Sequence, residues 1–563
     1  MNQGDWIQIT LFVGLLVLCT PLLGGYMAKV FAGERMWLTR WLGPLERLLY
    51  RLAGCDAKAE MRWKTYLIAL LLFNLFGFVV VFGLQVLQGW LPLNPQKFPN
   101  VPAALAFNTA VSFTTNTNWQ AYSGESILSY LVQMLGLAVQ NFLSAATGIA
   151  VLVALTRGLA RRSAATVGNF WADLVRSTLY VLLPLSLVFA LVLVGQGVVQ
   201  TFSPYLDATS LEGKAHQIPL GPAASQIAIK QLGTNGGGFF GLNSAHPFEN
   251  PTPLTNFLEM LAILLIPCAL TYTYGTMVGS RRQGWAIFAA MMILFLVGLA
   301  TALVAEHSNN PVLPNTANLE GKETRFGIVN SVLWATATTA ASNGSVNAMH
   351  DSLSPLAGLV TLFNLMLGEV AFGGVGAGLY GMLMFVVLTV FMAGLMVGRT
   401  PEYLGKKIEK REVVLAMLAV LAPCAVVLVC SALASVTDAG VSSLNNKGPH
   451  GLSEILYAFA SMGNNNGSAF AGLSANTSFY NLLGALAMLI GRFVIIIPAL
   501  AIAGSMVGKK VSPPSSGTFP TDGGLFVAML IGVVVIVGAL TYFPALTLGP
   551  VVEHLLMNHG RTF

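Results

Sequence analysis

The chain has 563 residues, of which 55% are hydrophobic and only 9% are charged. Soluble domains carry about 25% charged residues, so this composition excludes an ordinary soluble enzyme, and the mean hydropathy of +0.71 indicates a membrane protein. The net charge of +6 follows from basic loops beside a membrane and does not predict a nucleic-acid partner. The five cysteines have no metal-type spacing, so we expect small core residues rather than a disulfide framework.

Apolar segments of about 20 residues, long enough to cross a hydrocarbon core of ~30 Å, recur along the chain. They predict ten membrane-spanning helices, arranged as one helix, four two-span units and one further helix. The predicted spans are 6–27, 66–90, 127–155, 179–196, 254–277, 285–304, 353–397, 413–434, 480–504 and 525–543.

The first span, 6–27, has no basic residue before it, so it does not have the form of a signal peptide. Lys29 follows it, and most other lysine and arginine residues fall in loops on the same predicted side of the membrane. Because basic loops favour the cytoplasmic side, we expect both termini outside. Trp37, Trp41 and Trp63 lie among basic residues in the first inner loop, a mixture typical of a membrane interface.

Four short polar signatures recur within this apolar sequence, each built around a central Asn: Asn116, Asn235, Asn343 and Asn466. A single Asn-Gly dipeptide most often marks a turn. Four copies at a near-constant interval, each just before a long apolar segment, favour loops that line a pore, where non-helical backbone is tolerated at membrane depth. An aromatic residue precedes the central Asn by the same interval in copies one, three and four, as Phe107, Trp334 and Tyr457.

A short apolar segment, too brief to cross the membrane, precedes each signature: 103–114, about 223–232, about 328–341 and about 452–462. The C-terminal end of a helix carries about −0.5 of an elementary charge, so four such ends favour a cation. Rings of backbone carbonyls replace the hydration shell of K⁺ in channels, whereas Mg²⁺ and Ca²⁺ prefer carboxylates, and the signatures contain none. The predicted K⁺ filter is Thr115, Asn116, Thr117, Thr234, Asn235, Gly236, Ser342, Asn343, Gly344, Asn465, Asn466 and Gly467.

The third return segment, 353–397, is too long for one crossing and contains Gly373, Gly374, Gly376 and Gly378. We predict a broken helix and a flexible loop beneath the filter, placed to act as a gate; ordinary small-residue helix packing is the alternative. Glu369 precedes this run, and two roles stay open for it: pairing with a cation in the pore, or capping the broken helix.

Arg492 lies midway along the predicted span 480–504. A charge at that depth costs about 2.5–3.5 kcal/mol on insertion scales, so we expect it to face a cavity or a carboxylate and to form an electrostatic barrier below the filter. Snorkelling to the inner interface is the alternative. His246, Glu249, His350 and Asp351 follow signatures two and three; a metal site is conceivable, but hydrogen bonding within the loops is favoured.

Longer motifs surround the signatures, including the segments 108–120, 232–240, 246–252, 348–352, 398–406 and 464–473. With these motifs, the chain resembles over its whole length the potassium-translocating subunit of bacterial Kdp-type potassium ATPases, and more distantly the Trk/Ktr/HKT potassium transporters. The resemblance implies K⁺ as the transported ion, a multi-pass protein of the bacterial inner membrane, and a gating loop and basic residue under the filter. It also implies three partners: a P-type ATPase subunit, a single-span assembly subunit and a small hydrophobic peptide.

The chain contains no phosphate-binding loop, no Asp-Lys-Thr-Gly phosphorylation motif and no segment that predicts a nucleotide-binding domain. It is therefore expected not to be an enzyme by itself and to need no organic cofactor, only K⁺, its partner subunits and membrane lipid. A stand-alone channel or symporter of the Trk kind is the alternative function, and a membrane-embedded enzyme acting on lipid is a third. Thr117 is read as replacing the glycine of signature one, which predicts an asymmetric filter.

The sequence therefore predicts an all-α polytopic membrane protein, with four pseudo-repeated helix–pore loop–helix units around a central pore and one extra helix at each end. The expected units are 1–30 for the first helix, 62–157, 171–281, 284–400 and 411–508 for the four pore repeats, and 523–563 for the last helix.

Overall fold

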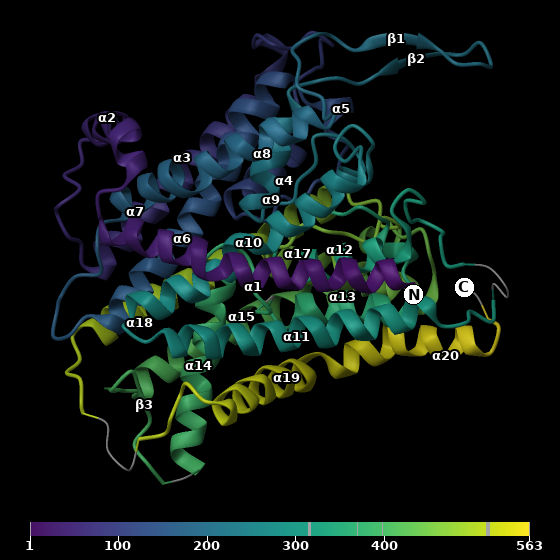
Figure 1. Cartoon of the computed structure of the whole chain (residues 1–563). Helices are drawn as coiled ribbons and strands as arrows, with labels where there is room; N and C mark the ends of the chain where they lie inside the picture. The colour runs from purple at the N-terminus through teal and green to yellow at the C-terminus, as the bar shows by residue number, and fades with distance from the viewer. Residues whose placement is uncertain (1, 313–316, 369, 397, 514–517, 562–563) are drawn as a thin grey trace.

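The computed structural model describes residues 2–312, 317–368, 370–396, 398–513 and 518–561. Within these residues the chain is almost entirely helical (Figure 1). Ten helical segments are long and apolar enough to cross a membrane, as predicted, so the protein is a multi-pass α-helical membrane protein.

Seven of these spans are single helices: α1 (Gln3–Ala32), α3 (Trp63–Val86), α10 (Pro253–Met277), α11 (Arg281–His307), α14 (Ala377–Met396), α15 (Lys410–Val436) and α18 (Ser478–Val507). The other three contain a wider π-helical stretch, and the helices of each run on without a loop. They are η2 with α6 (Val132–Ala138, Val139–Ala160), α7 with η3 and α8 (Phe170–Arg176, Ser177–Leu182, Leu183–Gly195), and α19 with η6 and α20 (Gly524–Leu546, Thr547–Val551, Val552–Asn558).

Four short helices end at the polar signatures, and they confirm the four predicted half-helices: α4 (Ala103–Thr114), α9 (Ala223–Leu232), α12 (Gly327–Ala340) and α17 (Gly448–Gly463). Each packs against the long helix that precedes it in the sequence, α4 on α3, α9 on α8, α12 on α11 and α17 on α15. The spans therefore hold the half-helices in place and set where the signatures lie.

The third return segment is broken, as predicted. Helix α13 (Pro355–Met366) stops short, and the glycine-rich loop leads to α14. Gly373 and Gly376 have φ angles of 64° and 80°, in the left-handed region that favours glycine, so a continuous helix cannot pass through them. Glu369 lies outside the described residues.

The predicted inner loop after the first span is instead a helix, α2 (Trp37–Leu52). Trp37, Trp41 and Leu48 recur at helical spacing and are exposed, the pattern of a helix lying in a membrane interface. Its other side is held by Glu46, whose carboxylate accepts hydrogen bonds from the hydroxyls of Tyr50 (2.8 Å) and Tyr180 (2.6 Å). The sequence analysis recognised the interface but missed the helix.

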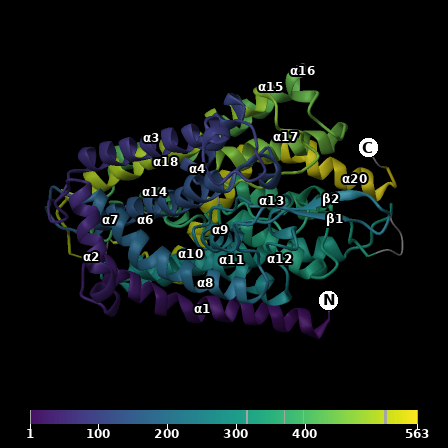
Figure 2. The ribbon, with the colours of Figure 1, turned by 90° about the horizontal axis from the view of Figure 1, so that it is seen from above.

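The remaining elements are short: α5 (Gly124–Ile127), α16 (Asp438–Val441), η1 (Gln88–Trp90), η4 (Asn243–Ala245), η5 (His350–Ser352), and the antiparallel pairs β1 (Leu206–Thr209) with β2 (Ala215–Ile218) and β3 (Glu402–Tyr403) with β4 (Lys406–Lys407). Helix α1 packs along α10, while α18 contacts both α15 and α6. Figure 1 shows the N- and C-termini at one end of the long helices and α2 and β3 at the other, and Figure 2 shows the same bundle from above.

Candidate pore loops and their surroundings

The four signatures, here called pore loops one (115–118), two (234–237), three (342–345) and four (465–468), share one backbone conformation. In each, two residues with left-handed φ angles flank a central residue. These pairs are Asn116 and Asn118 (64° and 53°), Thr234 and Gly236 (47° and 84°), Ser342 and Gly344 (48° and 86°), and Asn465 and Gly467 (61° and 104°).

Loop one is shifted by one residue from the predicted register. The central residue of every loop donates its backbone N–H to the carbonyl five positions earlier: Thr117 to Ser112 (2.9 Å), Asn235 to Lys230 (2.8 Å), Asn343 to Thr338 (3.2 Å) and Asn466 to Ser461 (2.8 Å). The central residue of loop one is thus Thr117, and the prediction that it replaces the glycine was wrong.

In this register Asn118 occupies the glycine position, and Asn108, rather than Phe107, matches Trp334 and Tyr457. Asn118 donates from Nδ2 to Oδ1 of Asn141, 2.6 Å away on α6. Three loops therefore carry glycine at this position and one carries an asparagine that is hydrogen-bonded away to a neighbouring helix.

Side-chain hydrogen bonds join the four loops and the ends of two of their half-helices in a closed ring. The Nδ2 atoms of the Asn residues donate across every junction: Asn116 to the Thr234 carbonyl (2.9 Å), Asn343 to the Lys230 carbonyl (3.1 Å), Asn466 to the Thr338 carbonyl (2.9 Å) and Asn465 to Thr117 Oγ1 (3.0 Å). Asn235 adds a second bond between loops two and one, to Asn116 Oδ1 (2.5 Å). The predicted filter residues are thus brought together from four distant parts of the chain.

Close packing explains the glycines. A side-chain carbon on Gly236 would collide with the carbonyl oxygen of Asn343, one on Gly344 with that of Asn466, and one on Gly467 with that of Thr117. Each glycine therefore abuts the central carbonyl of the next loop. The remaining filter candidate, Thr115, shares a hydrogen bond of 2.7 Å between its Oγ1 and that of Thr117.

A cavity of about 520 Å³ lies over the loops and is lined by Asn118 of loop one, Gly344 of loop three and Gly467 of loop four, together with the segment 240–243 that follows loop two. In the described part of the chain, none of the lining residues is Asp, Glu, Lys or Arg. His350 also lines it, and burial lowers the pKa of this histidine to about 4, so its ring is neutral at physiological pH. This cavity, here called the vestibule, therefore offers uncharged polar groups.

A buried ion pair braces loop two, and the sequence analysis missed it. Lys230 and Glu249 are both fully buried and form an ion pair. Lys230 Nζ also donates to Asn243 Oδ1 (2.7 Å), and Asn243 Nδ2 donates to the Gly236 carbonyl (2.5 Å). Glu249 accepts the N–H groups of Phe239 (2.6 Å) and Phe240 (2.9 Å). A lysine in the middle of an apolar half-helix was the available signal.

His246 and His350 form hydrogen bonds within the protein, as the sequence predicted in preference to a metal site. His246 Nδ1 accepts the N–H of Phe248 at 3.1 Å, and His350 Nδ1 lies 2.8 Å from the hydroxyl of Tyr457. Asp351 differs, because it lies beside His450 and Glu454 of α17, which were not among the predicted site residues.

The glycine-rich loop lies directly against pore loops two and three. The N–H of Gly373 donates to the Ala340 carbonyl (2.8 Å), and that of Val375 donates to Thr234 Oγ1 (2.9 Å). A side-chain carbon on Gly374 would lie 3.3 Å from Cβ of Ser342. The loop is therefore in contact with two of the four pore loops.

The same glycines also fit the loop against its other neighbours. A side chain on Gly376 would collide with the Gly148 carbonyl on α6, and one on Gly378 with the Phe372 carbonyl. Three of the four predicted glycines of the gate, Gly374, Gly376 and Gly378, thus lie where the chain is tightly packed.

Arg492 is buried in α18, with 5% of its surface exposed, so the snorkelling alternative is wrong. Its Nη2 donates to the Ser144 carbonyl on α6 (3.3 Å), and within the residues the structure describes it forms no ion pair with a carboxylate. Ser144 in turn donates from Oγ to Asn116 Oδ1 (2.7 Å). A side-chain carbon on Gly148, one turn further along α6, would meet both the guanidinium and the Val375 carbonyl. Arg492 therefore lies between loop one and the glycine-rich loop, with a main-chain carbonyl in place of the expected carboxylate.

The family described as "Potassium-transporting ATPase A subunit" matches residues 10–555. The chain belongs to this family. Curated relatives named "Potassium-transporting ATPase potassium-binding subunit" from Herpetosiphon aurantiacus and Sorangium cellulosum are each 60% identical, over 99% of this chain and their whole length. The relative of that name from Mesorhizobium japonicum is 58% identical over the full length of both chains.

The potassium transporter TrkH from Vibrio parahaemolyticus shares the fold at 16% identity. The TM-score is 0.53, and the match covers 88% of this chain and 98% of that one. The two proteins therefore share a fold.

Proposed function

We propose that this chain is the K⁺-translocating subunit of an ATP-driven potassium uptake complex and that its four pore loops form the selectivity filter. The observation that carries this proposal is the closed ring of hydrogen bonds among four loops from distant parts of the chain, each at the C-terminal end of a half-helix. The family and the names of the curated relatives support the same ion and the same kind of complex.

The chemistry of the ring suits K⁺ better than a divalent cation. Carbonyls and amides are available at the loops, and the vestibule lining contains no carboxylate in the described residues. Alternating left-handed residues turn successive carbonyls of a loop toward one side, which is how a filter presents oxygens to a dehydrated ion. Asn118 breaks the pattern of glycines, so the filter is asymmetric.

Below the filter, the glycine-rich loop forms the gate, and Arg492 forms an electrostatic barrier. The contacts of Val375 with Thr234 and of Arg492 with Ser144 support these roles, because both groups touch residues of the ring or residues bonded to it. An ion that leaves the filter must pass these two elements.

The wider arrangement is also proposed. The termini face outward, the four repeats span 62–157, 171–281, 284–400 and 411–508 between terminal helices within 1–30 and 523–563, and the complex lies in a bacterial inner membrane. The partners are a P-type ATPase subunit, a single-span assembly subunit and a small hydrophobic peptide, and this chain itself carries no catalytic site and no organic cofactor. The basic α2 region opposite the vestibule supports the orientation.

Transport by reconstituted protein tests this function against the Trk-type alternative, which the shared fold keeps open. Proteoliposomes containing the chain alone should not concentrate K⁺, whereas those containing the chain, the ATPase subunit and ATP should. Equal K⁺ uptake by the chain alone, without ATP, would show a self-sufficient channel or symporter instead.

A further inference from the structure

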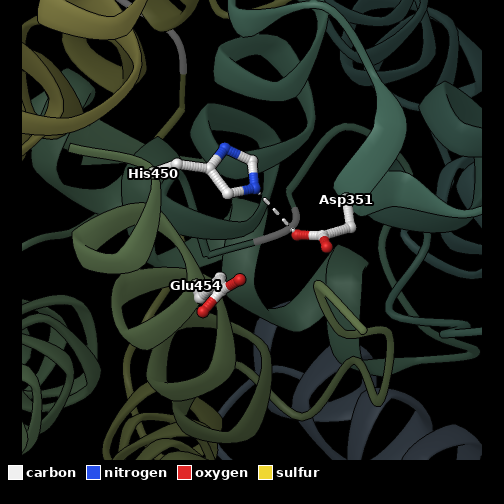
Figure 3. Close-up of side chains that lie close together, drawn as sticks. All are labelled: Asp351, His450 and Glu454. Atoms are coloured by element: carbon white, nitrogen blue, oxygen red, sulfur yellow. Dashed lines mark hydrogen bonds and ion pairs between the residues drawn. The ribbon is translucent and has the colours of Figure 1, made fainter. Parts of the chain in front are cut away.

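A cluster of metal-binding side chains lies beside pore loop four. Asp351 comes from η5, and His450 and Glu454 are one turn apart near the start of α17. One ligand atom from each of the three lies within 4.8 Å of the other two, and His450 Nε2 is 3.0 Å from Asp351 Oδ1. Figure 3 shows the imidazole and the two carboxylates gathered in one place. The three residues are thus close enough to bind one ion.

Glu454 provides a second, independent observation. Its residue surface is fully buried, and although its Oε1 accepts a hydrogen bond from Asn446 Nδ2 (2.7 Å), its Oε2 has no hydrogen-bond partner among the described residues. A buried carboxylate oxygen without a donor, next to a second carboxylate, is costly unless a cation or a proton neutralises it. Oε2 of Glu454 is therefore buried without a donor among the described residues.

The outer partners of the cluster have the arrangement of a metal site. Glu553 on α20 lies 2.7 Å from Nδ1 of His450, and a carboxylate on one ring nitrogen orients the other nitrogen toward a metal ion. Asp351 Oδ2 accepts the N–H of Gly472 at 3.1 Å, which fixes this second carboxylate. The imidazole and the Asp351 carboxylate are thus held in place before any ion binds.

We propose that Asp351, His450 and Glu454 form a binding site for a divalent transition-metal ion, Zn²⁺, with Glu553 as the hydrogen-bond partner of the histidine ligand. Zn²⁺ binds imidazole nitrogen and carboxylate oxygen, and three protein ligands leave a fourth position for water. The imidazole disfavours Mg²⁺ and Ca²⁺, which take oxygen ligands. The inference rests on this cluster alone and does not require the proposed transport function.

A proton on His450 is the competing occupant. Burial disfavours the charged ring, but the hydrogen bonds to Asp351 and Glu553 outweigh it and raise the pKa of His450 to about 10. A protonated imidazole satisfies Asp351 and Glu553, yet it leaves Oε2 of Glu454 without a partner. Zn²⁺ supplies that partner and displaces the proton when it binds, as metals generally do at histidine.

A bound ion would stabilise the outer structure around loop four. It would join the segment after loop three (Asp351) to the fourth half-helix, and through Glu553 to the last helix. His450 stacks on Phe470 with 5.8 Å between ring centroids, and Phe470 stacks on Tyr457 at 4.3 Å. The Tyr457 hydroxyl lies 2.9 Å from Ser468 Oγ in loop four. The site therefore connects to the filter through two ring contacts.

Metal binding to the purified full-length chain, first stripped with a chelator, tests the proposal. After incubation with Zn²⁺ alone and desalting, the wild type should retain about one Zn²⁺ per chain by elemental analysis. Glu454→Gln and His450→Gln should lose it, and Glu553→Gln should weaken the affinity about 10- to 100-fold. Co²⁺ should give a visible absorption band in the wild type that Glu454→Gln abolishes.

Two exposed residues of the β1–β2 hairpin give matched controls. Glu212→Gln and His216→Gln change the same side-chain types far from the cluster in sequence and should bind Zn²⁺ like the wild type. Gel filtration identifies any misfolded variant, and Glu454→Gln keeps the shape of the side chain if His450→Gln misfolds. A wild type that retains no Zn²⁺, or a folded Glu454→Gln variant that retains it fully, would overturn the proposal.

Discussion

At the scale of single residues, the proposed filter contains glycines whose replacement is blocked in two ways. Gly344 has a φ angle of 86°, which costs a non-glycine residue about 1–3 kcal/mol, and a side chain there would strike the Asn466 carbonyl. The backbone strain at Gly344 can be tested separately from the collision, because Gly327 at the start of α12 has a φ angle of 75° but open space around it.

We expect Gly344→Ala to reduce discrimination between K⁺, Rb⁺ and NH₄⁺ in uptake assays, because the added methyl group displaces a carbonyl of the next loop. Gly327→Ala carries a similar backbone strain without the collision and should keep the wild-type selectivity. Unchanged discrimination in a correctly inserted Gly344→Ala variant would contradict the assignment of this ring as the filter.

Arg492 acts on the ion through its charge if the proposed barrier is correct. At ~6 Å and an effective dielectric constant of ~20, two unit charges interact by roughly 3 kcal/mol, about a hundredfold in rate or occupancy. Arg492→Gln should therefore uncouple K⁺ flux from ATP hydrolysis or allow a leak, while Arg492→Lys should retain much of the activity. ATPase activity and K⁺ flux measured together decide this; equally mild effects of both changes would remove Arg492 from the transport step.

Breaking the Lys230–Glu249 pair should destabilise the protein strongly, because the remaining charge would be buried without its partner. Removing one partner of a fully buried pair typically costs about 3–5 kcal/mol, whereas the exposed Lys214–Glu212 pair contributes about 0–1 kcal/mol. Lys230→Met should lower the apparent unfolding temperature in detergent much more than Lys214→Met does. Equal unfolding temperatures of the two variants would show that Lys230 does not brace loop two.

At the scale of elements, the break between α13 and α14 brings a loop under the filter that a continuous helix could not supply. Its glycines fit against α6 and loops two and three. Because the loop touches the filter from below, changes in it should alter the passage of ions more than their entry.

Gly376→Ala tests this separation of entry and passage. A methyl group there would collide with the Gly148 carbonyl, so we expect a lower rate of ATP-driven K⁺ uptake with little change in the K⁺ concentration for half-maximal uptake. Gly381→Ala on α14, where a methyl group would meet only Val370 Cγ1 at 3.4 Å, is the control. An equal loss of K⁺ affinity and rate in Gly376→Ala would indicate misfolding instead.

The half-helices and the broken segment were predictable because polar or glycine-rich residues interrupt long apolar runs. The predicted register of loop one was wrong by one residue because Thr and Asn alternate over residues 115–118, so that a shift by one residue preserves the pattern. Helix α2 was not predicted, because the alternation of apolar and basic residues at an interface indicated an inner loop. The contacts Lys230–Glu249 and Asp351–His450 were not predictable, because tertiary folding brings these partners together.

At the scale of the whole molecule, ten spans bring both termini to one end of the bundle (Figure 1). The orientation predicts which surfaces are accessible in cells. Leu211→Cys, in the exposed β1–β2 hairpin, should react with a membrane-impermeant thiol reagent in spheroplasts, and Lys58→Cys should react only after permeabilisation. Labelling in the opposite order would reverse the proposed topology.

The contact between Asn465 and Thr117 closes the ring across 348 residues of sequence. Synthesis and membrane insertion proceed from the N-terminus, so the fourth loop is the last to arrive. A partly synthesised chain holds up to three loops with an open side, and it has no complete set of oxygens to replace the hydration shell of an ion. In the proposed filter, the order of the loops along the chain thus postpones a complete set of coordinating oxygens until residues 465–468 of the 563 have been made.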